Sequence, residues 1–482
     1  MEQRGVTGKS TYGNIRSAIV YLFTSTNTPR PGDFDATMKK FFKGLHHTVI
    51  ATVQSTNKRL TEGKEPFTLS MYRALSKTLL KSAKKQDVFG HAFLVICWNL
   101  ICRAKSAESI RHAHIGWRED ALAVVFAHMK NDQDGSRPRD PRHIYANPIA
   151  PEICPILALG IYFAVLGFSD DGRLFPGGSQ YCRYLKLLKD ALTADSVAEI
   201  LNEFGFTADD FGSHSARKGA ATYVSSCSTA GPSAASICLR AGWTLPGVQD
   251  KYIRYEAAGD QIVGRYVAGL PFTSAAFATL PPHFVTMDDV YTGSVIADAI
   301  EATFPGVPQC LRAVCRFGLA SIAYHEPFLR RELPGNHLLF STALFQDGYA
   351  SKLHQIQRCV VCRPHHANDS ITPTGIPPHI GIMASLDDCK SDVLSIREGV
   401  RSDVEEAIKR HVHGSIMTME ALESAFAAAL ERSVIQNGLN ISRSTVMSAG
   451  EPETSSPFVS QPELFTWNGS FHRVPCDFVL PN

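Results

Sequence analysis

Hydrophobic residues recur at three- and four-residue intervals through the first 85 residues, the spacing of amphipathic helices. The pattern predicts helices over 14–23, 34–53 and 69–84, separated by stretches rich in Pro, Gly and Asn. In the third helix the apolar residues form one face and the basic residues lie mostly off it, so the helix can pack while it presents cations. Its apolar positions are Met71, Leu75, Leu79 and Leu80, and its basic ones are Arg73, Lys77, Lys81 and Lys84.

Residues 86–270 combine helical and strand patterns. A continuous apolar run predicts a buried helix over 88–102, and two short runs predict strands over 114–117 and 122–127. A turn sequence follows the second strand directly, which places Lys130 at the mouth of a hairpin. Further helices are predicted after it, so we expect an α+β fold that is mainly α with a small β-sheet.

A third region begins after Leu270, where prolines at 271, 281 and 282 mark a boundary. It includes a long amphipathic helix or helix pair over 386–436, whose apolar face fits either packing within the domain or self-association. A Ser/Thr/Pro-rich linker follows. The chain is therefore predicted to have a helical domain over 1–85, an α+β domain over 86–270, a mostly helical extension over 271–440, a linker over 441–462 and a C-terminal motif over 463–482.

Charge is unevenly distributed, although the formal net charge is only +2. Residues 1–85 contain 15 Lys and Arg against 5 Asp and Glu, which leaves the rest of the chain at about −8. A basic first segment suits a polyanion partner. A solvated basic surface without a partner would give the same count.

Other features exclude membrane and secreted classes. The apolar run 93–102 is too short to span a bilayer, and the first ten residues lack the apolar core of a secretory signal. The twelve cysteines are scattered among apolar segments, which indicates reduced thiols in an intracellular protein. Cys359 and Cys362, with His365 and His366 nearby, lack a second ligand pair at zinc-site spacing, so we predict no metal.

The most specific chemical pattern lies within residues 212–254. His214 and Arg217 are three apart, so on a helix they share one face and can address one anion together. Trp243 follows an Ala-Gly pair, and Tyr252 lies nine residues after it. This string resembles the second catalytic box of the tyrosine recombinases, a family that cuts and rejoins DNA through a covalent link between a tyrosine and a backbone phosphate.

The resemblance extends to two upstream residues. Arg103, at the end of the apolar helix, and Lys130, at the hairpin, match the arginine and the lysine that the family carries there. Ser106 stands where many members have an acidic residue, with Glu108 two positions further on, so the support of Arg103 departs from the family pattern. The catalytic set that the resemblance implies is Arg103, Lys130, His214, Arg217, Trp243 and Tyr252.

The family roles follow ordinary phosphate chemistry. Arg103 and Arg217 would clamp the phosphate, whose oxygens gain charge in the transition state, and Trp243 would donate one N–H and order the site. No metal or other cofactor is needed, because the phosphotyrosine link keeps the bond energy for religation.

The proton transfers are assigned to the remaining residues. Tyr252 would be the nucleophile, with Tyr255 as its competitor, and His214 would be the general acid/base. A lysine such as Lys130 would deliver the proton that the leaving 5′-oxygen needs.

Further stretches are similar to one branch of the family. Residues 142–148, 153–160 and 174–177 look like the catalytic domains of crypton-type mobile-element recombinases of eukaryotes. Residues 466–481 resemble more loosely a DNA-binding motif that is attached to such elements and shared with some fungal transcription activators. That motif normally continues further, so the resemblance leads us to expect a truncated or decayed product.

These resemblances imply a mobile-element recombinase or integrase that acts in the nucleus and assembles as a homotetramer on double-stranded DNA. A helical core-binding domain and the catalytic domain would form a clamp around the duplex. Two alternatives stay open: a domesticated DNA-binding protein with the same fold, and a type IB topoisomerase. The predicted phosphate contacts are Lys39, Lys40, Lys43, Arg73, Lys77, Lys81 and Lys84.

Overall fold

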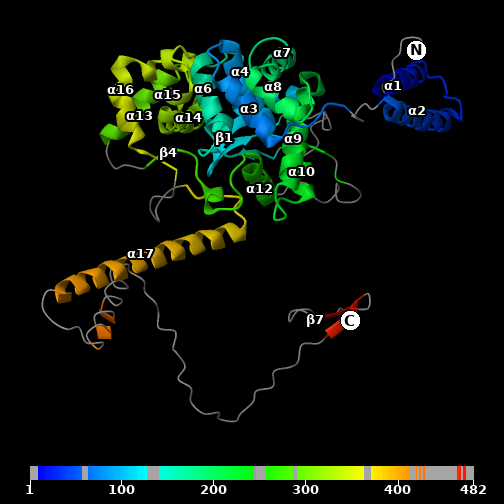
Figure 1. Cartoon of the computed structure of the whole chain (residues 1–482). Coiled ribbons are helices and arrows are strands. Elements are labelled where there is room, and N and C mark those ends of the chain that lie inside the picture. The colour runs from blue at the N-terminus through cyan, green and yellow to red at the C-terminus, as the bar shows by residue number, and fades with distance from the viewer. Residues whose placement is uncertain are drawn as a thin grey trace, which may run out of the picture. The chain divides into compact units, whose positions relative to one another are not determined.

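Within the residues that the computed structural model describes, the protein is mainly α with a three-stranded sheet and two two-stranded sheets (Figure 1), as the sequence pattern predicts. The chain forms two compact units, residues 1–387 and 388–482. The described residues are 9–56, 63–126, 140–243, 245, 257–285, 290–362, 371–412, 420, 423–424, 427–428, 464–467 and 470–473.

The first two helices contain the predicted helices 14–23 and 34–53 and extend beyond them. They are α1 (Lys9–Ser25) and α2 (Phe34–Thr56), which pack against each other. Phe23 and Phe34 meet edge to face with ring centroids 6.0 Å apart. Asp35, in the first turn of α2, pairs with Arg16 of α1 at 2.9 Å.

The helix α4 (Lys85–Asn99) forms the centre of the core, since every residue from Val88 to Asn99 is buried. Around it pack α3 (Leu69–Leu80), α6 (Pro155–Leu166), α7 (Gln180–Leu192) and α9 (Ser213–Ser226). α8 (Asp195–Glu203) packs on α3.

The third predicted helix has the expected apolar face but ends early. Met71, Leu75, Leu79 and Leu80 are buried. The helix stops at Leu80 and not at residue 84, because Lys84 already occupies the N-cap of α4. A short turn between the two helices therefore replaces the last predicted helical turn.

The three-stranded sheet is antiparallel, in the order β1 (Ile115–Arg118), β2 (Ala121–Val124) and β3 (Arg142–Ile144). Ile115 pairs with Val124, and Val124 with Arg142. The predicted strands 114–117 and 122–127 correspond to β1 and β2. The sequence pattern does not predict β3, because three residues are too few to show alternation.

The region after residue 270 shares its core with the preceding one. It contains α13 (Val290–Thr303), α14 (Arg312–Tyr324), α15 (Glu326–Glu332), α16 (Ala350–Gln357) and the strand pair β4 (His283–Phe284) and β5 (Val360–Val361). α14 packs on α6 so closely that a Cβ on Gly160 would lie 3.0 Å from the carbonyl oxygen of Gly318. One buried apolar cluster runs from Phe67 to Ile380, so packing is continuous across the predicted boundary at 270.

The last described elements are α17 (Pro378–Val412) and the antiparallel strands β6 (Leu464–Trp467) and β7 (Ser470–Arg473). α17 starts eight residues before the predicted helix 386–436, and its described part ends at Val412. None of the helices in the described ranges combines the length and apolar character that a membrane crossing requires.

Candidate active site

Arg103 lies at the junction of α4 and the short helix α5 (Ala104–Glu108), where it is the N-cap residue of α5. α4 ends before the predicted residue 102 because Ile101 adopts a left-handed conformation, with a φ of 49°. Its N–H and that of Cys102 donate to carbonyls in the last turn of α4, as in a Schellman cap. A β-branched residue costs about 1–2 kcal/mol there, so a strained, buried turn leads the chain into Arg103.

Arg217 projects from α9 and is 6% exposed. Its Nη2 donates to the carbonyl oxygen of Ala241, the last residue of α10 (Ala234–Ala241), at 2.8 Å. Burial, and next the nearby charge of Arg103, lowers the pKa of Arg217 to about 10, so the guanidinium stays protonated at neutral pH. Neither Arg103 nor Arg217 forms an ion pair with a described carboxylate.

Trp243 covers the same guanidinium. The Cζ atom of Arg217 lies 5.4 Å from the centroid of its indole ring, within the range of a cation–π contact. Gly242 ends α10 with a φ of 66°, a left-handed conformation that favours glycine and turns the chain toward the ring. The indole is 36% exposed. The structure thus brings Arg103, Arg217 and Trp243 together, and we call these three residues the anion site.

His214 is exposed in the first turn of α9, three residues before Arg217. The positive end of the α9 dipole lies at this turn and favours an anion. Lys130, Tyr252 and Tyr255 lie outside the described residues. Their approach to the anion site stays a prediction.

A segment that the sequence pattern does not single out crosses α9 next to His214. Phe67 N–H donates to the Ser215 carbonyl at 3.1 Å, and Lys218 Nζ donates to the Lys64 carbonyl at 2.6 Å. A Cβ on Gly219 would lie 2.2 Å from the Phe67 carbonyl oxygen, so only glycine fits this crossing. Gly219, directly after the Arg-Lys pair, is the one local signal of this arrangement. Lys64 and Lys218 add amines near the start of α9.

The predicted DNA contacts fall into two groups. One group is exposed and forms no ion pair with a described residue. It comprises Lys39, Lys40 and Lys43 on α2 and Lys84 at the start of α4.

The other group, on α3, is paired with acids of the chain itself. Arg73 Nη2 lies 2.6 Å from Oε1 of Glu152, and Lys77 and Lys81 lie 3.2 and 2.9 Å from Oε2 of Glu332 on α15. Hydrogen bonds from the two lysines lower the pKa of Glu332 to about 2. These three cations are therefore partly neutralised within the fold.

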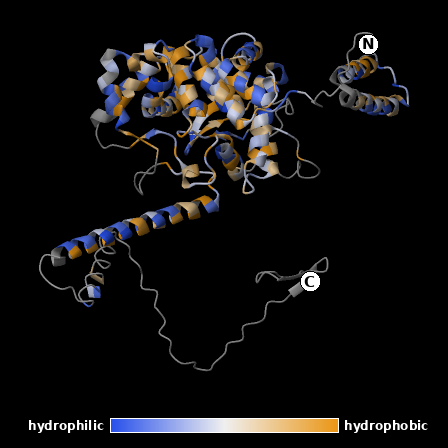
Figure 2. Ribbon diagram, viewed as in Figure 1, coloured by the Kyte–Doolittle hydropathy of each residue, from blue (hydrophilic) through white to orange (hydrophobic). Residues whose placement is uncertain are grey.

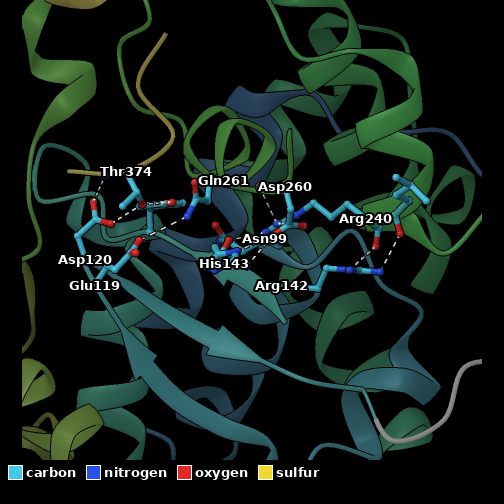
Figure 3. A network of polar contacts seen from close by, with 11 residues as sticks. Asn99, Glu119, Asp120, Arg142, His143, Arg240, Asp260, Gln261 and Thr374 are labelled. Atoms are coloured by element: carbon cyan, nitrogen blue, oxygen red, sulfur yellow. Dashed lines mark hydrogen bonds and ion pairs between the residues drawn. The ribbon is translucent and has the colours of Figure 1, made fainter. Parts of the chain in front are cut away.

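A buried polar network is built around Arg240 (Figure 3). Arg240 of α10 has no exposed side-chain surface and donates to Asp260, to Asn99 O and to His143 O, each at 2.8 Å. Burial raises the pKa of Asp260, but Arg240 and His143 outweigh it and bring the pKa to about 2. The network joins α10, the end of α4, β3 and α12 (Ala257–Val267), so it fixes the elements that lead to Arg103 and Trp243.

A second polar network fastens the segment before α17 to the sheet (Figure 3). Asp120, in the β1–β2 turn, pairs with Arg265 of α12, and both side chains are fully buried. Thr374 Oγ1 donates to Asp120 Oδ1 at 2.6 Å and lies 2.6 Å from Tyr145 Oη. The extension is thus held to the α+β domain by polar contacts as well as by its apolar core.

Among the described residues, no three His, Cys, Asp or Glu side chains group as metal ligands would. No protein-family model matches this chain, and no curated protein matches it. Function is therefore inferred from the site itself.

Proposed function

We propose that the protein is a tyrosine recombinase that breaks and rejoins DNA through a 3′-phosphotyrosine intermediate on Tyr252. The observation that carries the proposal is the pair Arg103 and Arg217: the charge of Arg103 acts on the buried guanidinium of Arg217, and neither side chain has a described carboxylate partner. Like charges in a partly buried position are unfavourable unless an anion joins them. The two non-bridging oxygens of a phosphodiester match two guanidinium forks.

The proposed reaction balances without a cofactor. The Tyr252 hydroxyl loses its proton to His214 and attacks phosphorus, and the bond from phosphorus to the 5′-oxygen breaks. The leaving 5′-oxygen takes a proton from Lys130. A 5′-hydroxyl of the same or another duplex reverses the step and frees the tyrosine. Arg103 and Arg217 stabilise the charge that gathers on the phosphate oxygens in both steps.

Affinity for the duplex would come from exposed cations. Lys64 and Lys218, which meet where the segment before α3 crosses α9, join the exposed lysines of α2 and Lys84 as proposed phosphate contacts. The sequence resemblance supports the remaining parts of the proposal: a mobile-element origin, action in the nucleus and a homotetramer on DNA.

A pool of duplexes with a nick and a randomised flanking sequence tests the proposal without knowledge of the target. Cleavage beside a nick releases a short fragment and traps the protein on DNA, so adducts can be recovered under denaturing conditions and amplified. The wild-type chain should form adducts, Tyr252→Phe should form none, and Arg217→Lys should reduce them at least about 100-fold. The matched control, Tyr255→Phe, should keep them.

Each of the other outcomes would overturn one part of the proposal. Adducts that survive Tyr252→Phe and vanish with Tyr255→Phe move the nucleophile. A wild-type chain that retards duplexes but traps none is a DNA-binding protein only. Relaxation of supercoiled plasmids regardless of their sequence would identify a topoisomerase.

A further inference from the structure

We infer that α17 associates in parallel with α17 of another copy of this chain. The helix carries an apolar stripe whose members alternate at four and three residues over three heptads: Ile382, Leu386, Cys389, Val393, Ile396 and Val400. This is the a/d spacing of a coiled coil, with Leu386, Val393 and Val400 at a. Hydrophobic positions recur along the whole helix in Figure 2.

The first four members of the stripe are exposed in the single chain, and Ile396 and Val400 are half-buried. Ile382 is 62% exposed, and Leu386 and Val393 are each 63% exposed. Helices in water gain most of their stability from packing an apolar face, and not from intrinsic propensity. A 35-residue helix with an open apolar stripe therefore lacks the contact that would stabilise it.

Charge complementarity identifies a second copy of α17 as the partner helix and a parallel orientation as the favoured one. Asp392 precedes the a position Val393, which makes it a g residue, and Arg397 follows the d position Ile396, which makes it an e residue. In a parallel, in-register assembly each g residue meets the e residue five positions further on in the neighbouring copy. The carboxylate of Asp392 would thus meet the guanidinium of Arg397.

An antiparallel arrangement loses this match, because it pairs g with g and e with e. Neither Asp392 nor Arg397 forms an ion pair with a described residue of its own chain. Both charges are therefore available to a second copy of the same helix.

Cys389 gives the assembly a built-in reporter. It is an exposed free cysteine at a d position of the stripe. In a parallel, in-register assembly the two Cys389 side chains face each other across the seam, where a disulfide can close. An antiparallel or shifted pairing separates them.

The inference is independent of the proposed recombinase activity, because it concerns the free protein and needs no DNA. The full-length chain is measured without DNA by sedimentation equilibrium and, after oxidation with oxidised glutathione, on non-reducing gels. We expect a mass of two or more chains and a disulfide-linked dimer. Cys389→Ser should abolish the cross-link, whereas Cys182→Ser, which removes another exposed cysteine, should keep it.

Charge reversal tests the direction. Asp392→Arg should weaken association at least tenfold, and the double variant Asp392→Arg with Arg397→Asp should restore it. Both positions are on the helix surface, and circular dichroism checks that the fold persists. A monomer whose Cys389 does not cross-link overturns the inference. A cross-link that charge reversal leaves unchanged overturns the parallel register.

Discussion

Arg217 and Arg240 are both buried arginines, and their surroundings are opposite. Arg240 donates to the carboxylate of Asp260 and to three backbone carbonyls, so its charge and its N–H groups are satisfied within the fold. Arg217 has one carbonyl partner, and the charge that perturbs it most is another guanidinium, that of Arg103. The fold thus uses Arg240 to join its elements, whereas under the proposed function the charge of Arg217 would be balanced by the phosphate.

The strained turn at Ile101 belongs to the same contrast. The polar network fixes the end of α4 through Asn99, directly before that turn. The stability that the network provides therefore offsets the unfavourable backbone conformation of Ile101 and the repulsion between Arg103 and Arg217. Substitutions in the two regions should change stability in opposite directions.

Loss of the Asp260 charge should have the largest effect. Asp260→Asn leaves Arg240 buried without its carboxylate, which should lower the free energy of unfolding by about 3–5 kcal/mol. Urea unfolding followed by circular dichroism measures it. Asp190→Asn, on the exposed surface of α7, is the matched control and should change stability by less than about 0.5 kcal/mol. A loss below 1 kcal/mol for Asp260→Asn would show that the network does not support the site.

As the pH falls, protonation of buried histidines should destabilise the core before protonation of Asp260 weakens the polar network. Burial lowers the pKa of His91 and of His325 to about 4, so the folded state binds these protons less readily than the unfolded state does. Above about pH 6.5 these imidazoles are neutral in both states, so the free energy of unfolding does not depend on them. As the pH falls toward 4, only the unfolded state binds the protons, which lowers the free energy of unfolding by about 3 kcal/mol for each residue. The Asp260 contribution, with a pKa of about 2, is lost only at lower pH.

Unfolding in urea at several pH values between 7 and 4 tests this order. His325→Gln should flatten the dependence on pH, because it removes one of the buried histidines whose pKa is lowered. A stability that is constant over this range would contradict the assignment of neutral, buried imidazoles.

Removal of Arg103 should have the opposite sign to the Asp260 substitution. Arg103→Gln relieves the repulsion on Arg217, so the free energy of unfolding should rise by up to about 1 kcal/mol. Lys186→Gln removes an exposed cation of α7 and serves as the control, with no change expected. A clear loss of stability in Arg103→Gln would mean that this arginine is a structural residue like Arg240.

The smallest effect concerns the basic face of α3. Glu332→Gln frees Lys77 and Lys81, so binding to non-specific duplex DNA should strengthen. The dependence of the binding constant on salt concentration should steepen by about one released counterion. Glu326→Gln, on the same helix α15, is the matched control. An unchanged salt dependence would place the DNA contacts of the proposal elsewhere, on α2 and beside α9.

Local patterns predict the helices and the first two strands because those signals lie within a few residues. They fail where tertiary structure decides. Ile101 ends α4 early although its sequence continues the apolar run, and β3 is too short to show a period. The polar networks escape prediction because Arg240 and Asp260, or Asp120 and Thr374, are far apart in sequence and leave no local pattern.

The candidate site divides in the same way. His214, Arg217 and Trp243 belong to one string with regular spacing, and the structure places Arg103 near Arg217 as that interpretation needs. Lys64 and Lys218 could not be assigned from sequence, because only the close backbone crossing at Gly219 brings them together.

The anion site is tested most directly by the rise in melting temperature of the full chain with inorganic phosphate at constant ionic strength. Binding at a defined site stabilises in proportion to the logarithm of ligand concentration above its Kd, whereas general salting effects act on every variant. The account predicts a saturating rise for the wild-type chain and for Lys186→Gln, and only the general effect for Arg103→Gln and Arg217→Lys. An equal rise in all four proteins would contradict it.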